Sequence, residues 1–169
     1  MFRWGLLTPW AAEPADGLRL INARSETAHE KASFKNALKA RRCVVPADGF
    51  YEWKEQGRDK QAMLIRRRDE KPMALAGLWS RWKDLYSFTL LTCAPNALMA
   101  PIHDRMPVIL DRLDWECWLE SGEASLGKLL QPCPEEWLEA QPVSSAVNSV
   151  RNEGPGLWEP PAKVQQNLF

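Results

Sequence analysis

The sequence predicts a single β-rich α+β domain, and three observations lead to this fold class. The chain has 169 residues with 45% hydrophobic content, which suffices for one domain with a sizeable core but not for two of ordinary size. The middle of the chain consists of short apolar runs bounded by glycine, proline or charge, a pattern typical of strands. Helical patterns are short and lie on either side of these runs.

The N-terminal part is expected to alternate between strand and loop before a first short helix. Residues 1–7 form a strand-like run, residues 8–17 a loop containing two prolines, and residues 18–28 a second strand-like segment. Ser33 can cap a short helix that runs through Arg41.

Five consecutive strands are predicted in the middle of the chain. They correspond to residues 43–45, 50–53, 62–67, 73–79 and 87–92. Between the second and third runs, residues 56–59 read Gln-Gly-Arg-Asp, which predicts a hairpin turn.

The C-terminal part is expected to combine short helices with two further strands. In order, we expect a helical turn at 95–100, a strand at 107–110, a capped helix, a helical stretch at 125–130, a strand at 138–143 and an irregular tail at 155–169. Asp111 or Asp114 can cap the helix, which would carry Trp115, Trp118 and Leu119 on one side.

Charge and cysteine content narrow the possible functions. With 22 basic and 22 acidic residues the net charge is zero, so a nucleic-acid partner must be held by a local patch. The cysteines, Cys43, Cys93, Cys117 and Cys133, form no Cys-x-x-Cys pair and lie near no histidine doublet, so neither zinc nor another cofactor is expected. Apolar stretches shorter than the ~20 residues of a membrane span predict a cytoplasmic protein with reduced thiols.

Three polar residues alternate along one strand-like segment. Asn22, Arg24 and Glu26 would project from the same face of a strand. A solvated strand face explains this pattern. A binding site also explains it, with Arg24 gripping a phosphate or carboxylate and Asn22 offering a donor and an acceptor to a base or sugar.

Glu52 and His103 are the candidates for proton transfer. Glu52 lies between two aromatic residues, whose dry surroundings would raise its pKa toward the range useful for catalysis; the alternative is an exposed strand carboxylate. His103 lies in a loop enclosed by prolines that could hold an imidazole rigidly; the alternative is a structural histidine satisfied by Asp104. His29, in a charged context, is expected at the surface.

Taken together, several segments resemble the SOS-response-associated peptidase family, also called abasic-site processing proteins. The resemblance is close and runs in order along nearly the whole chain. The matching segments are Trp4-Gly5-Leu6-Leu7 with Trp10, Ile21-Asn22-Ala23-Arg24-Ser25-Glu26-Thr27, Arg42-Cys43-Val44-Val45-Pro46-Ala47-Asp48-Gly49-Phe50-Tyr51-Glu52-Trp53, Ile102-His103-Asp104-Arg105-Met106-Pro107, and Pro142-Val143-Ser144 with Val147-Asn148.

The resemblance implies a barrel-like β fold with flanking helices and a monomer that binds abasic sites in single-stranded DNA, away from membranes and close to the nucleoid. It further implies that Asn22 and Arg24 contact the DNA and the abasic site. Glu52 would be the proton-transfer group, His103 would help to open and stabilise the sugar, and Trp10 would stack on a base at the lesion.

In that family an N-terminal cysteine closes a thiazolidine with the ring-opened sugar, forming a covalent DNA–protein cross-link. This chain begins Met1-Phe2, so we expect a domain that lacks the family's N-terminal segment and, in this form, does not make the stable adduct. Two alternatives remain: a peptidase limited to self-processing, and a non-covalent single-stranded-DNA-binding remnant.

Overall fold

The structure is a computed structural model that describes residues 1–120 and 122–161. Within these residues, nine strands form two sheets. The first sheet contains β1 (Phe2–Trp4), β2 (Asn22–Arg24), β3 (Arg42–Ala47), β6 (Met73–Trp82), β7 (Leu85–Cys93) and β8 (Met106–Pro107). The second contains β4 (Gly49–Gln56), β5 (Asp59–Arg67) and β9 (Leu138–Pro142).

Strand β7 organises the first sheet. The strand order of this sheet is β1-β7-β6-β3, with β6 antiparallel to both β7 and β3. Both β1 and β2 pair in parallel with the other edge of β7, where Phe2 is opposite Tyr86 and Asn22 is opposite Leu90. Strand β8 pairs antiparallel with the C-terminal end of β7. The end of β7 is therefore where β2, β8 and the loops next to them meet.

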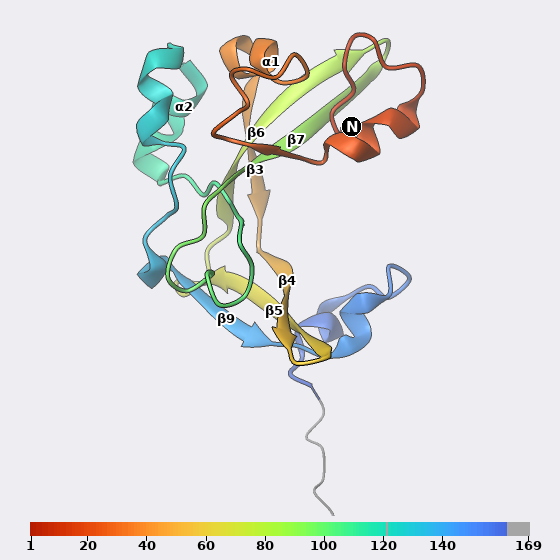
Figure 1. Ribbon diagram of the computed structural model, residues 1–169, viewed down its shortest axis with the longest axis vertical. Helices are drawn as coiled ribbons and strands as arrows, with labels where there is room; N and C mark the ends of the chain where they lie inside the picture. The colour runs from red at the N-terminus through yellow and green to blue at the C-terminus, as the bar shows by residue number, and fades with distance from the viewer. Residues whose placement is uncertain (121, 162–169) are drawn as a thin grey trace, which may run out of the picture.

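The chain passes between the two sheets three times, the last time between β8 and β9. Strand β3 continues past Asp48 into β4, and β5 leads back into β6. Figure 1 shows the two sheets crossing to form a half-barrel, with β3, β6 and β7 in one part and β4, β5 and β9 in the other. The predicted β-rich, barrel-like α+β fold is confirmed, as are the five central strands and the hairpin turn at Gly57.

Alternation along β7 separates the core from a second, open face. Ser87, Thr89 and Leu91 are buried, whereas Phe88 and Leu90 between them are only half-buried. Because successive side chains of a strand point to opposite faces, one face packs into the core and the other lies open between the two sheets.

A buried arginine fastens the helices α1 (Lys35–Ala40) and α2 (Trp115–Glu120) to the first sheet. Arg42, at the start of β3, donates hydrogen bonds to the carbonyl oxygens of Leu38 at 2.6 Å and Leu119 at 3.3 Å. Carbonyls at the last turn of a helix have no partner within that helix. The guanidinium therefore caps both helices.

The two N-terminal strands are shorter than the sequence predicts. The first strand ends at Trp4 because Gly5 has a φ of +110°, and the segment 18–28 contributes only Asn22–Arg24. The residues before it form a 3₁₀ helix, Pro14–Leu20, whose Asp16 carboxylate accepts hydrogen bonds from the backbone N–H groups of Ala12 and Glu13. Proline and a turn-forming aspartate therefore outweigh the strand-like alternation.

The expected tryptophan side of the second helix also needs correction. Asp111 caps the region as predicted, accepting from the Leu113 N–H at 2.9 Å. Trp118 is fully buried, but Trp115 and Leu119 are 39% and 46% exposed. Since α2 has only six residues, it covers the core with a single large side chain.

The remaining short elements lie at the C-terminal end. Five further 3₁₀ helices span Arg112–Asp114, Glu123–Lys128, Glu135–Trp137, Ser145–Asn148 and Pro155–Trp158 within the part of the chain that the structure describes. The expected irregular tail lies partly outside the described residues, at 162–169. None of the helices in the described ranges is long and apolar enough to cross a membrane.

Candidate functional site

A cavity of about 400 Å³ lies where the two sheets face each other. Its walls come from both sheets and from the loop before β8. The lining residues are Trp4, Asn22, Arg24, Phe50, Tyr51, Glu52, Leu75, Leu90, Thr92, His103, Arg105, Met106 and Pro107. A volume of this size is typical of small-ligand sites.

Strand β2 presents two polar side chains to this cavity. Asn22 and Arg24 are exposed, whereas Ala23 between them is buried. Their register opposite Leu90 and Thr92 of β7 places all four side chains on the open face of the first sheet. The predicted alternation is therefore present, and it leads into a cavity.

Glu52 enters the cavity from the second sheet. It lies on β4 beside the cavity-lining aromatic residues Phe50 and Tyr51, and its side chain is 23% exposed. Burial raises the pKa of Glu52 above its ordinary value; His103 opposes this shift and Asp104 adds to it. The carboxyl group is thus held where it retains a proton more readily than a free glutamate does.

His103 lies opposite Glu52, with 3.9 Å between His103 Nε2 and Glu52 Oε2. On the other side of the ring, Nδ1 is 3.1 Å from both the backbone N and the backbone O of Arg105, and 3.4 Å from Asp104 Oδ1. Asp104 therefore does contact the ring as the structural interpretation expects. The nitrogen that faces the cavity is nevertheless directed at Glu52.

Arg105 joins three segments at the cavity wall. Its Nη1 and Nη2 donate to the Glu26 carboxylate at 2.7 and 2.8 Å, and Nη2 also donates to the Thr92 carbonyl. The bidentate contact with Arg105 lowers the pKa of Glu26, and that with Glu26 raises the pKa of Arg105. Glu26, expected on the same strand face as Arg24, lies instead beyond the end of β2.

The predicted site residues are brought together with one exception. Asn22, Arg24, Glu52 and His103 share the cavity, although the last two are separated from β2 by tens of residues. The exception is Trp10, which is not among the residues that line the cavity and is 62% exposed.

The tryptophan that lines the cavity is Trp4 instead. Its indole Nε1 donates to the Ile21 carbonyl at 2.8 Å, which holds the ring beside Asn22. Sequence reasoning also missed Thr92 and the guanidinium of Arg105. Proximity to His103 could have indicated Arg105, but nothing local marks Thr92, whose place depends on the pairing of β2 with β7.

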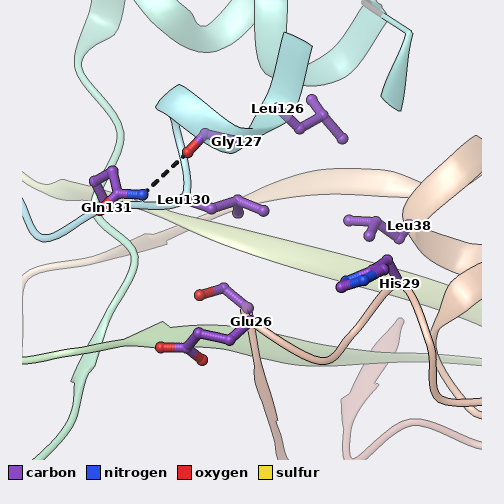
Figure 2. A pocket seen from close by; sticks show the side chains of 8 residues that line it. Glu26, His29, Leu38, Leu126, Gly127, Leu130 and Gln131 are labelled. Carbon is purple, nitrogen blue, oxygen red and sulfur yellow. Dashed lines mark hydrogen bonds between the residues drawn. The ribbon is translucent and has the colours of Figure 1, made fainter. Parts of the chain in front are cut away.

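A larger cavity, of about 640 Å³, is lined by Glu26. Figure 2 shows Glu26 and His29 on one side of it and Leu126 and Leu130 on the other, with Gln131 donating to the Gly127 carbonyl. His29 is 53% exposed and contacts Glu30, as its charged context predicts. Glu26 is paired with Arg105 and His29 with Glu30, so we take the smaller cavity, where Glu52 and His103 face each other, as the candidate site.

Three of the four thiols are not activated nucleophiles. The four cysteines are free, and burial raises the pKa of both Cys43 and Cys93 to about 11 and that of Cys133 to about 12. Because the thiolate is the reactive form, these three residues remain thiols near neutral pH. Within the described ranges, no three His, Cys, Asp or Glu residues lie in a metal-binding arrangement.

Comparison with known proteins gives consistent matches. The family model described as SOS response associated peptidase (SRAP) matches residues 1–150. The abasic site processing protein YoqW of Bacillus subtilis (strain 168) is 44% identical over 166 residues, covering 93% of this chain and 74% of that protein. The abasic site processing protein YedK of Escherichia coli (strain K12) is 33% identical over 165 residues, covering 93% and 72%.

The fold is also similar to solved structures. A crystal structure of a protein from Bacteroides thetaiotaomicron superposes with a TM-score of 0.85 at 29% identity, covering 94% of this chain and 75% of that one. A second, from Bordetella bronchiseptica, gives 0.75 at 32% identity, covering 85% and 76%.

Proposed function

The chain belongs to the SOS response associated peptidase family, and from that premise we propose that it recognises abasic sites in single-stranded DNA through the cavity between its two sheets. One observation carries the proposal: Asn22, Arg24, Glu52 and His103 converge on a single cavity from two sheets and a loop. The names of YoqW and YedK, both abasic site processing proteins, support the same substrate.

Each side chain suits one part of an abasic site. Among the described residues, Arg24 has no hydrogen-bond or ion-pair partner, so its guanidinium is available to a flanking phosphate. Asn22 offers a donor and an acceptor to the sugar. Trp4 and the more exposed Trp10 offer flat faces on which a neighbouring base can stack.

Glu52 and His103 supply the proton transfers. When an amine condenses with the ring-opened sugar aldehyde, a proton leaves the nitrogen and a proton reaches the departing oxygen, which leaves as water. The Glu52 carboxyl group, whose pKa is raised by burial, can deliver the second proton and, as a carboxylate, accept the first, while His103 Nε2, 3.9 Å away, can donate a hydrogen bond to the sugar oxygen. Both halves of the pair come from one chain, which favours a monomer as the functional unit.

Covalent capture by the internal cysteines is not part of the proposal. Thiazolidine closure needs a thiol and a free α-amine on the same residue, and Cys43, Cys93, Cys117 and Cys133 are internal. After incubation with aldehydic abasic DNA, we expect no shifted band from these residues on a denaturing gel. A surviving band that maps to one of them would contradict this chemistry.

The test of the proposal is a comparison of affinities. Fluorescence anisotropy would measure binding to a single-stranded oligonucleotide with one stable abasic analogue, to the intact strand and to a duplex with the same lesion. We expect the abasic single strand to bind at least about tenfold more tightly (~1.4 kcal/mol) than either control. Equal affinities for the intact and abasic strands would refute lesion recognition.

For the peptidase activity in the family's description, we propose self-processing alone. Incubation with a supplied peptide library is expected to give no products. Turnover of supplied peptides that disappears in Glu52→Gln or His103→Ala would instead favour a general protease.

A further inference from the structure

The ion pair between Glu26 and Arg105 reaches three segments that meet at the cavity. The Thr92 carbonyl accepts from Arg105 Nη2 and also, at 2.8 Å, from the backbone N–H of Ser25. One carbonyl of β7 thus anchors both the turn that carries Glu26 and the side chain of Arg105. The planar guanidinium matches this arrangement because it can serve a carboxylate and a carbonyl at once.

The geometry of the Glu26–Arg105 ion pair favours a role in orienting side chains over a role in stabilising the fold. Glu26 is 51% exposed and Arg105 only 20%. An ion pair with one partner in water adds little to stability because solvent screens it. Its bidentate form nevertheless fixes the position of the arginine closely.

The backbone of Arg105 in turn controls His103. Its N–H and its C=O both lie 3.1 Å from His103 Nδ1. A neutral ring can accept the N–H at Nδ1, and a protonated ring can donate its Nδ1–H to the carbonyl. In both states Nε2 carries a hydrogen toward Glu52 Oε2, 3.9 Å away. The Arg105 backbone therefore holds the ring in the same orientation whichever of its two groups bonds to Nδ1.

We propose that Glu26 is a positioning residue of the cavity: through Arg105 it fixes the backbone of residues 103–105 and keeps His103 Nε2 directed at Glu52. The carboxylate does so from outside the acid–base pair, at the boundary between the two cavities, where Figure 2 shows it at the edge of the larger one. That this orientation of His103 serves catalysis rests on the proposed function; that Glu26 maintains the orientation does not.

The tautomer of His103 tests the proposal directly. The chain has two histidines, so long-range ¹H–¹⁵N spectra of the ¹⁵N-labelled protein contain two imidazole patterns, and His29→Gln assigns them. At pH 8.5, where free imidazole is neutral, we expect His103 to be an Nε2–H tautomer in the unmodified chain. In Glu26→Ala we expect a mixture of both tautomers, with part of the original pattern recovered in Glu26→Asp.

A matched control lies four residues further on. Glu30 contacts His29 at 3.4 Å, so Glu30→Ala should alter the His29 pattern alone, just as Glu26→Ala alters that of His103 alone. The milder Glu26→Gln, which retains an acceptor of the same shape, provides a folded sample if Glu26→Ala does not fold. An unchanged His103 tautomer in a folded Glu26 variant would overturn the proposal.

These spectra need no DNA, so their outcome separates the two proposals. If Glu26 variants change the His103 tautomer while abasic and intact strands bind equally, the positioning role stands and lesion recognition fails. If abasic strands bind selectively and the tautomer does not respond to Glu26, the reverse holds.

Discussion

At the scale of single residues, the burial of Glu52 links its protonation to folding. Its pKa is raised in the folded protein, so its contribution to stability is complete below the pKa of the unfolded chain and is lost as pH rises through the folded value. Gln cannot ionise. We therefore expect Glu52→Gln to become progressively more stable, relative to the unmodified chain, as pH rises from 4 to 7.5.

Urea unfolding at several pH values would measure this difference. The matched control is Glu55→Gln, on the same strand with its side chain 81% exposed, for which we expect a smaller pH-dependent change. A Glu52→Gln variant that instead loses stability relative to the unmodified chain as pH rises would show that burial does not dominate at Glu52.

Arg24 is expected to contribute one phosphate contact. Arg24→Gln should weaken binding to single-stranded DNA of any sequence and reduce the slope of log K against log salt by about 1. Arg58→Gln, in the exposed β4–β5 turn, removes the same charge far from the cavity and is the control. Equal effects of the two substitutions on the slope would mean that general charge, not this side chain, attracts DNA.

The site could be predicted from sequence only in pieces. Alternation indicated Asn22 and Arg24, and the aromatic and proline-enclosed surroundings indicated Glu52 and His103, but each pattern also had a plain structural explanation. What decides between them is the approach of β4 to the loop before β8, a tertiary contact that no local pattern encodes. Thr92 could not be predicted, because its place at the cavity depends on the register of β2 with β7 and on its backbone carbonyl.

At the scale of elements, the attachment of the two helices depends on Arg42. Lysine cannot reach the Leu38 and Leu119 carbonyls together, since its single ammonium replaces a wide guanidinium. We expect Arg42→Lys to lower the free energy of unfolding by about 2–4 kcal/mol, measured by denaturant titration. The exposed control Arg58→Lys should stay within ~0.5 kcal/mol; a similar loss in both would rule out the capping role.

The N-terminal loop depends on two glycines in backbone contact. A Cβ on Gly17 would lie 2.5 Å from the Gly5 carbonyl oxygen, which forces the loop apart. We expect Gly17→Ala to cost about 1–3 kcal/mol in thermal or denaturant unfolding. Gly156→Ala, whose Cβ would meet nothing closer than 3.9 Å, should be nearly neutral, and equal effects at both positions would contradict this explanation.

The elements differ in how far the sequence predicted them. The central strands followed from apolar runs between turn residues, since four of them form two hairpins of strands adjacent in sequence, β4–β5 and β6–β7. The segment around β2 did not, because its strand length is set by parallel pairing with β7 and by the close approach of Gly5 and Gly17. Short-range patterns carry no information on either contact.

At the scale of the whole molecule, charge is balanced and its longest basic run is not available to a ligand. The net charge is zero, and the basic run at 66–68 is engaged within the fold: Arg66 pairs with Glu139, Arg67 with Asp69, and Arg68 donates to the Leu138 carbonyl. We expect a shallow salt dependence of single-strand binding, with a slope of about −1 to −2. A slope near −5 would require a basic surface beyond the cavity.

The parallel pairing of β1 and β2 with β7 also determines when, during folding, the protein becomes able to bind DNA. Asn22 meets Leu90, and Glu52 meets His103, only after long stretches of chain have been closed into loops, and such non-local contacts form slowly. The hairpins β4–β5 and β6–β7 can assemble early, without a binding site. During refolding, the capacity to bind DNA should therefore return with the slowest phase, after most of the strand signal in circular dichroism has recovered.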